Sequence, residues 1–298
     1  MRHASALLAL LLGTAAAAFA QECPAPAAPA GNLAPAPDLR GLRVGVAFGS
    51  GAMHGLAHIG VIQELEARGL KVEVVAGTSV GAIVGALWAS GYSGAQIESL
   101  SQDSNWESVG TWAGSFRGLL SAGSVHKQLE RLFDGRPIES WPRRFGAVAT
   151  EMARGERRIL AAGDGAEAVR ASSTAPVLFA PVVVSGQQLV DGALVEPVPV
   201  GAARALGADF VIGVDVAYRP YEDTAKGVVQ FAFQAIHVLL NALSAEQLRA
   251  SDFAVRMDVH HTLMHCGTPG LIAAGRERMR ELWPALVEAL ARRARARR

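Results

Sequence analysis

From about Gly41 onward, short apolar runs alternate with longer stretches in which apolar residues recur at helical spacing. Short apolar runs are typical of buried strands, whereas recurrence every three to four residues is typical of helices. The pattern predicts strands at residues 42–48, 72–76, 145–150, 181–184, 187–192 and 210–216, and helices at residues 56–69, 79–91 and 199–206. This alternation favours an α/β fold with a mainly parallel sheet and helices on both faces.

Local signals indicate two further helices. Ser93 and Gln96 have the spacing of an N-terminal capping pair, and the run SVHKQLERLF begins a helix behind Ser124. The segment 105–123 between them has no clear period and contains two tryptophans and a phenylalanine. It is either a lid over a pocket or an irregular surface loop, and the pattern leaves both open.

Residues 1–20 have the pattern of a secretory signal peptide. The basic residue Arg2 precedes an apolar run that reaches Leu12, and small residues follow up to an A-x-A cleavage pattern at 18–20. We expect cleavage before Gln21 and export from a bacterial cytoplasm, to the periplasm or beyond. An N-terminal membrane anchor is disfavoured because the apolar run is short for a spanning helix.

Residues 21–40 are rich in Pro and Ala without an apolar period, which is typical of an extended linker. We expect the main domain at residues 41–260 and a helical segment with an Arg-rich tail at 261–298. The chain has two cysteines, Cys23 and Cys266, so neither a CxxC metal site nor a disulfide framework is available, and a single bridge stays open.

The 28 basic and 27 acidic residues nearly cancel, so no overall field favours nucleic acid. The C-terminus has five arginines among its last seven residues, behind an apolar helix face that contains Trp283. This end either contacts anionic lipid headgroups, with Trp283 at the interface, or is a solvated helix end whose cations suit the helix dipole.

The run Gly77-Thr78-Ser79-Val80-Gly81 lies between a predicted strand and a predicted helix. This is the context that a GxSxG nucleophile elbow requires. Gly77 and Gly81 remove side chains where strand and helix pass close together, and the turn lifts the Ser79 hydroxyl to the N-terminal end of a helix. Free amides at that end favour developing negative charge.

A glycine-rich loop, Gly49-Ser50-Gly51-Ala52-Met53-His54-Gly55, follows the first predicted strand. Its backbone N–H groups suit either a phosphate or the oxyanion of an acyl-transfer intermediate. A dinucleotide fold requires an acidic residue at the end of the next strand, but the only acid there, Glu73, lies near the start. The arrangement therefore favours hydrolysis.

Asp191-Gly192 ends a predicted strand, and Gly192 allows a sharp turn that leaves the carboxylate at the sheet edge. A serine hydroxyl is a weak nucleophile at neutral pH and needs a base within hydrogen-bond reach. Asp191 is the candidate for that base.

These three motifs, within VGVAFGSGAMHGLAHIGVIQELEARG, GTSVGAIVGALWA and the run from AVRASSTAP to VDGALVEPVPV, resemble the patatin-like phospholipase family in order and spacing. The resemblance covers roughly residues 42–216. It implies a three-layer α/β/α fold, hydrolysis of lipid acyl esters and a Ser–Asp dyad, with no metal and no organic cofactor. It makes Ser79 the nucleophile, Asp191 the base and Gly49 to Ala52 (Gly49, Ser50, Gly51, Ala52) the oxyanion loop.

The chain departs from the family pattern at two positions. His54 stands where the family commonly has an arginine, just before Gly55, and Glu196 stands where it often has an asparagine after the Asp-Gly motif. Both are expected to affect substrate or rate. Histidine is largely neutral above neutral pH, so His54 would not supply the arginine's permanent charge.

Other interpretations remain beside this one. His260, His261 and His265 follow Asp191 in the chain, so a Ser-Asp-His triad or a metal site with Cys266 would fit the order, but the spacing favours surface or partly buried histidines. His58 lies one helical turn after His54, where a packing or capping role is expected. A protein of another class, a lipid-binding or regulatory protein with weakened chemistry, is the main rival.

We predict that the exported protein begins at Gln21, because the A-x-A pattern follows an apolar run with a basic start. N-terminal sequencing of the protein recovered from outside the cytoplasm checks this. A membrane-bound product that retains Met1 would contradict it.

Overall fold

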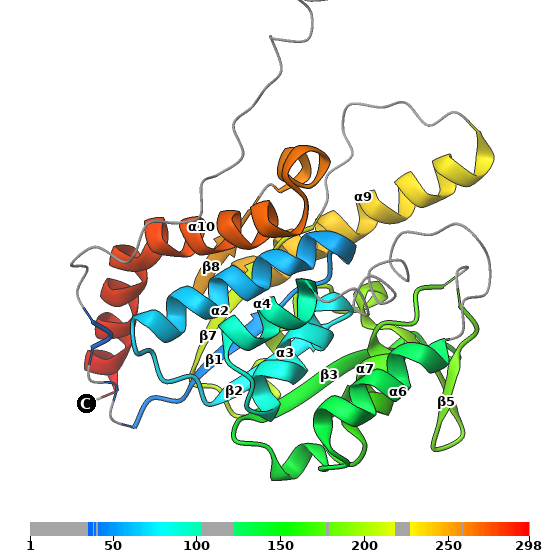
Figure 1. Ribbon diagram of the computed structural model, residues 1–298, viewed down its shortest axis with the longest axis horizontal. Coiled ribbons are helices and arrows are strands. Elements are labelled where there is room, and N and C mark those ends of the chain that lie inside the picture. Colours follow the sequence, from blue (N-terminus) through cyan, green and yellow to red (C-terminus); the bar gives the residue numbers. More distant parts are fainter. Residues whose placement is uncertain are drawn as a thin grey trace, which may run out of the picture.

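The computed structural model describes residues 35–37, 39, 41–102, 122–176, 179–217, 227–257 and 259–297 (Figure 1). The expected signal peptide, Cys23 and residues 105–121 of the aromatic segment lie outside this part of the chain. The choice between a lid and a surface loop, and the single bridge considered between Cys23 and Cys266, therefore fall on residues outside the described part of the chain.

The central sheet has eight strands in the described part of the chain, paired in the order β5-β6-β3-β2-β1-β7-β8, with β4 beside β3. The strands are β1 (Val44–Phe48), β2 (Val74–Thr78), β3 (Arg144–Glu151), β4 (Glu156–Leu160), β5 (Val182–Val184), β6 (Gln187–Asp191), β7 (Phe210–Asp215) and β8 (Phe253–Arg256). Strand pairs β1-β2, β1-β7, β2-β3 and β7-β8 are parallel, whereas β3-β4, β3-β6 and β5-β6 are antiparallel. The prediction of a mainly parallel sheet is confirmed.

Helices connect and cover these strands (Figure 1). They are η1 (Ala52–Leu56), α2 (Ala57–Ala67), α3 (Val80–Ser90), α4 (Gly94–Gln102), α6 (Ala122–Phe133), η2 (Ile138–Ser140), α7 (Gly165–Ser172), η3 (Gly192–Leu194), α8 (Val200–Ala205), α9 (Val228–Arg249) and α10 (His260–Ala296). The predicted capping pair is present at the start of α4, where the Ser93 N–H donates to the Gln96 side chain at 2.9 Å.

Successive side chains of the inner strands point to opposite faces of the sheet. Val46, Phe48 and Val75 belong to the larger core with residues of α2, α3 and α10, whereas Ala47 and Ala76 belong to a smaller core with residues of α8. The sheet is thus covered on both faces, and the three-layer α/β/α arrangement is confirmed.

Strand β3 brings the ends of β2 and β6 to one point. Thr78, the last residue of β2, pairs with Val148, and Asp191, the last residue of β6, pairs with Ala149. Strand β4 pairs with β3 along the same residues. Because a strand has only two edges, β2 and β6 must lie end to end along the other edge. Residues that adjoin Thr78 and Asp191 are therefore close in space.

Helices α2 and α10 cross with their backbones in contact. A Cβ atom on Gly60 would lie 1.9 Å from the carbonyl oxygen of Ile272, and one on Gly275 would lie 1.9 Å from the carbonyl oxygen of Ala57. Glycine at both positions is what allows this approach.

A buried carboxylate adds charge pairing to the same contact. Glu64 of α2 is fully buried, and its oxygens lie 2.6 Å from Arg68 and 3.6 and 3.5 Å from Arg276 and Arg280 of α10. A buried charge without a partner is costly, so these arginines fix which residues of α10 lie over α2.

The end of α10 packs against the body of the protein. Trp283 is 1% exposed, and the Arg68 guanidinium lies 5.8 Å from its ring centroid. The interpretation that placed Trp283 at a lipid interface is therefore wrong. Arg297 pairs with the Asp209 carboxylate at 2.7 Å, and Arg293 donates to the Asp209 carbonyl oxygen.

We predict that Gly275→Ala lowers the free energy of unfolding. A Gly-to-Ala change inside a helix normally stabilises by about 0.5–1 kcal/mol, but here the added methyl group overlaps the α2 backbone, and overpacking costs about 1–3 kcal/mol. Urea denaturation followed by circular dichroism measures the difference. Ala285→Ser, at an exposed position of the same helix, serves as the control and should change stability by less than about 0.5 kcal/mol. A Gly275→Ala protein as stable as the wild type would contradict the close crossing.

Candidate active site

Ser79 occupies a strained turn between β2 and α3. Its backbone has φ 57° and ψ −126°, which is unusual for a residue other than glycine. A Cβ atom on Gly77 would lie 2.4 Å from the Gly81 carbonyl oxygen, and one on Gly81 would lie 2.2 Å from the Phe48 carbonyl oxygen. Both glycines are therefore needed where strand, turn and helix meet, as the motif predicts.

Hydroxyl groups from the end of α7 and from β2 hold this turn. The buried Ser172 hydroxyl accepts the Ser79 N–H at 3.1 Å and donates to the Val148 carbonyl oxygen at 2.6 Å. The Ser173 hydroxyl donates to the Ser79 carbonyl oxygen at 3.2 Å, and the Thr78 hydroxyl donates to the backbone of Glu196. The turn is thus held from both sides by groups distant in sequence.

Asp191 ends β6 beside this turn. Gly192, which follows it, leaves no space for a side chain, because a Cβ atom there would lie 2.1 Å from the Val148 carbonyl oxygen. The Asp191 carboxylate is 7% exposed. It accepts the Ala193 N–H at 2.9 Å, and the Ser79 side chain is close enough to influence its pKa.

Burial controls the protonation of this carboxylate. It raises the pKa of Asp191 to about 6, while the hydrogen bond from the Ala193 N–H and the nearby Ser79 side chain act in the opposite direction. Asp191 is therefore mostly ionised at pH 7 and above, yet it is more basic than an ordinary aspartate. A carboxylate in this state can accept the Ser79 proton.

The glycine-rich loop lies against the same turn, because a Cβ atom on Gly55 would lie 2.2 Å from the Val80 side chain. Two of the four N–H groups expected to bind an oxyanion are already engaged: Gly49 donates to Val214 at 2.9 Å and Ser50 donates to Pro197 at 2.8 Å.

The N–H groups of Gly51 and Ala52 donate to no backbone carbonyl among the described residues. Ala52 is exposed and has φ 48°. Of the four expected donors, Gly49, Ser50, Gly51 and Ala52, the last two are therefore those without a backbone partner in the described part of the chain.

Two histidines hold the carbonyl oxygens of the loop. His58 is fully buried, and its Nε2 lies 2.8 Å from the Gly49 carbonyl oxygen. Burial lowers the pKa of His58 to about 4, so the ring is neutral near pH 7 and donates through Nε2. His54 approaches the Gly51 carbonyl oxygen through Nδ1 at 3.2 Å. The His54 ring thus contacts the backbone of the loop. That His54 lacks the permanent charge of an arginine, with an effect on substrate or rate, stays a prediction.

The Glu196 side chain contacts α8 and β4. Its carboxylate is buried, accepts the Ala202 N–H at 3.2 Å at the start of α8, and pairs with Arg157 at 3.0 Å. Burial raises the pKa of Glu196, and Arg157 acts in the opposite direction. The Glu196 side chain therefore stabilises the start of α8. The Glu196 backbone contacts the turn, because its carbonyl oxygen accepts the Thr78 hydroxyl.

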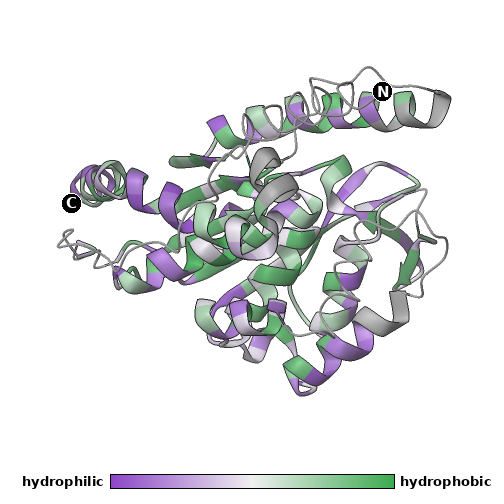
Figure 2. Cartoon of the chain, turned by 45° about the horizontal axis from the view of Figure 1, so that its top comes forward, coloured by the Kyte–Doolittle hydropathy of each residue, from purple (hydrophilic) through white to green (hydrophobic). Residues whose placement is uncertain are grey.

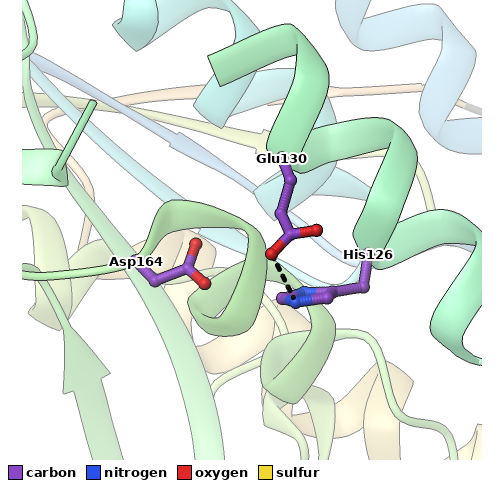
Figure 3. Close-up of side chains that lie close together, drawn as sticks. All are labelled: His126, Glu130 and Asp164. Carbon is purple, nitrogen blue, oxygen red and sulfur yellow. Dashed lines mark ion pairs between the residues drawn. The ribbon is translucent and has the colours of Figure 1, made fainter. Parts of the chain in front are cut away.

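A second group of polar side chains lies apart from Ser79. His126 and Glu130 of α6 face Asp164, with ligand atoms within 4.8 Å of one another, and His126 pairs with Glu130 at 3.2 Å (Figure 3). Asp164 also accepts the Ala166 N–H at 2.8 Å as the N-terminal cap of α7. An i,i+4 ion pair and a helix cap account for these three residues.

The side chains of His260, His261 and His265 lie outside the described residues, although their backbone forms the start of α10. The triad and the metal site considered for them are therefore untested. Ser172 and Ser173 are not predicted from the sequence as part of the site. Their run, AVRASSTAP, was part of the resemblance, but a serine that bonds backbone groups has no sequence signature of its own.

Sequence comparisons find similar proteins. A family model described as patatin-like phospholipase matches residues 46–204. An uncharacterised NTE family protein of Mycobacterium tuberculosis is 33% identical over 183 residues, covering 58% of this chain and 49% of that protein. Lysophospholipase NTE1 of Pyricularia oryzae is 29% identical over 205 residues, covering 65% of this chain and 14% of that protein. The chain thus spans about half of the first relative and a small part of the second.

Two solved structures have a similar chain path. VipD from Legionella pneumophila has a TM-score of 0.47 at 12% identity, covering 82% of this chain and 67% of that chain. A chain in the complex of full-length SpcU with full-length ExoU from Pseudomonas aeruginosa has a TM-score of 0.42 at 14% identity, covering 84% of this chain and 53% of that chain.

We predict that Ser172→Ala weakens both the fold and the reactivity of Ser79. The change leaves the Ser79 N–H and the Val148 carbonyl without their partner, which costs about 1–3 kcal/mol. Urea denaturation and the rate of labelling by a fluorophosphonate probe measure the two effects. Ser172→Thr, which keeps a hydroxyl, should restore part of each.

Ser101→Ala is the matched control, because Ser101 is also buried but donates only within α4, to Glu98. A folded Ser172→Ala protein that is labelled at the wild-type rate would show that the turn does not depend on this hydroxyl.

Proposed function

Because the chain belongs to the patatin-like phospholipase family, we propose that it is a lipid acyl hydrolase in which Ser79 is the nucleophile and Asp191 the base. The observation that carries the proposal is the meeting of β2 and β6 along one edge of β3, which brings the Ser79 side chain close enough to the buried Asp191 carboxylate to lower its pKa. The loop that packs against the same turn contains Gly51 and Ala52, whose N–H groups donate to no backbone carbonyl among the described residues.

The proposed reaction has two steps. Asp191 takes the hydroxyl proton as the Ser79 oxygen attacks the ester carbonyl, and the N–H groups of Gly51 and Ala52 bind the oxyanion. The proton passes from Asp191 to the leaving alkoxide as the ester C–O bond breaks. Water then attacks the acyl-enzyme, Asp191 accepts a proton from that water, and the fatty acid leaves as Ser79 regains a proton.

The proposed substrate is a carboxylic ester of a lipid. A relative that is named a lysophospholipase supports phospholipid-derived esters as the class to test first. We also propose that the enzyme acts outside the cytoplasm, which the pattern of residues 1–20 supports. Contact of the C-terminal arginines with a membrane is not part of the proposal, because Arg293 and Arg297 bond to Asp209.

Labelling by a fluorophosphonate probe separates this proposal from a lipid-binding protein with weakened chemistry. A hydrolase is labelled at Ser79 and loses label with Ser79→Ala. A wild-type protein that binds lipid but takes up no label would decide for the binding protein.

We predict that Ser79→Ala and Asp191→Asn each remove nearly all hydrolysis of a short-chain ester, whereas His260→Ala, His261→Ala and His265→Ala each retain most of it. The reason is that the base in this arrangement is the carboxylate and not an imidazole. Initial rates measure the effect, with circular dichroism to confirm folding. A folded histidine variant as inactive as Ser79→Ala would replace the dyad with a triad.

We predict that kcat/KM falls as the pH drops through about 6. Burial raises the Asp191 pKa to about 6, so the carboxylate is protonated below that pH and cannot take the Ser79 proton, whereas above pH 7 it is ionised and the rate reaches a plateau. Rates between pH 4.5 and 8.5 give the profile. A midpoint near 4, the ordinary aspartate value, would mean that burial does not tune the base.

A further inference from the structure

The exposed large apolar side chains of the described chain are not spread evenly. They are Met152, Val183, Phe231, Ile236, Val238 and Leu239. Four of them belong to one helix, α9, whose Phe231 and Leu239 are 68% and 66% exposed. Scattered apolar residues on a surface are ordinary, but a group of them on one element marks a contact site.

Helix α9 carries large apolar side chains on its outer face as well as on its buried face. Phe231, Val238 and Leu239 have the i, i+7, i+8 spacing of one helix face, and all three are exposed. Ser244 and Leu248, on the opposite face, are 1% and 6% exposed. Apolar residues normally face the core, so an outer face that the described residues leave uncovered suits an apolar partner.

The outer face also has no charge. The sequence contains no Asp, Glu, Lys or Arg from Val228 to Ala245. Burial lowers the pKa of His237, the one titratable group in this stretch, so it is neutral near pH 7. No described helix is long and apolar enough to cross a membrane. The helix therefore suits a surface that accepts apolar side chains from one side.

The other exposed apolar residues lie beyond the same edge of the sheet. Met152 follows directly after the end of β3, and Val183 pairs with Gln188 in the β5-β6 hairpin, which continues past Glu151 at the end of β3. Helix α9 starts from the same side, because it follows the end of β7, and it projects past the sheet (Figures 1 and 2). Ser79 follows the end of β2, which is parallel to β3, so the candidate active site is at this edge as well.

We propose that α9 is a docking surface for the uncharged, apolar region of a lipid membrane; Met152 and the β5-β6 hairpin lie at the same end of the strands, on the other side of β2 and β1 from β7 and α9. The proposal rests on the proposed function, since a lipid ester reaches Ser79 from such a surface. A protein partner is disfavoured because specific protein interfaces carry a polar rim, which the uncharged stretch of α9 does not offer. Binding would come from burial of apolar side chains in the interface, without attraction to anionic headgroups.

The test measures binding of the full-length Ser79→Ala protein to vesicles by cosedimentation, so that the lipid is not consumed. We expect binding to pure phosphatidylcholine vesicles that is nearly unchanged by added phosphatidylglycerol or by salt. Phe231→Ser and Leu239→Ser should each weaken it about tenfold or more, because each removes a large apolar side chain from the interface.

Two control variants match these changes. Glu246→Ser alters an exposed residue of α9 outside the uncharged stretch, and Arg292→Gln combined with Arg295→Gln removes charge from the C-terminus. Neither should change binding to phosphatidylcholine. The Phe231→Ser and Leu239→Ser changes in the Ser79-containing enzyme should leave hydrolysis of a soluble short-chain ester at the wild-type rate.

Three results would overturn the docking surface: Phe231→Ser and Leu239→Ser proteins that bind like the parent, binding that requires anionic lipid and the C-terminal arginines, or a dimer that Phe231→Ser dissociates in the absence of lipid. Failure of the proposed function is distinct, since it would be seen as no soluble ester hydrolysis by the Ser79-containing enzyme whatever its vesicle binding.

Discussion

The candidate site depends on one arrangement of backbone, in which β2 and β6 end against each other along the same edge of β3. The two strands are far apart in sequence and run in opposite directions, so their ends deliver Ser79 and Asp191 to one place. The approach is possible only because Gly77, Gly81 and Gly192 have no side chains, since a Cβ atom on any of them would meet backbone at 2.1–2.4 Å. Backbone packing thus fixes the distance between nucleophile and base before any catalytic hydrogen bond forms.

Hydrogen bonds to the backbone hold Ser79 in its strained conformation. The Ser172 and Ser173 hydroxyls bond the N–H and the carbonyl of Ser79, and His58 holds the Gly49 carbonyl from within the core. A strained residue persists where the surrounding structure over-determines it. His58 can serve this purpose because burial keeps it neutral, so it adds no charge near the loop. His58 therefore positions the backbone of the loop that contains Gly51 and Ala52.

The sequence predicted the features that depend on the local spacing of glycine and apolar residues. The glycine spacing identified the turn at Ser79, and the apolar runs gave most inner strands within two residues, although β2 begins at Val74 instead of residue 72 and continues through Thr78. Strands β4 and β8 and helices α7 and α9 were not indicated. Strand β4 has the charged sequence ERRIL because it lies at an exposed edge, so it lacks the apolar pattern of a buried strand. The partners of Ser172 and Glu196 are set by tertiary contacts, which no spacing in the chain reveals.

The hydrophobic pattern also fails to predict α9, and the reason lies in how that helix is buried. Helix α9 has apolar residues on its exposed face, such as Phe231, and on its buried face, such as Leu248, so its sequence does not indicate which face meets the core. Leaving Phe231 and Leu239 in water forgoes on the order of 1.5–3 kcal/mol of burial for each side chain. The core of this protein is otherwise closed, with Trp283 and the α2-α10 contact fully covered. Among the described residues, the exposed large apolar side chains belong to elements around the active-site edge. Their exposure is therefore a property of that edge and not of a poorly packed fold.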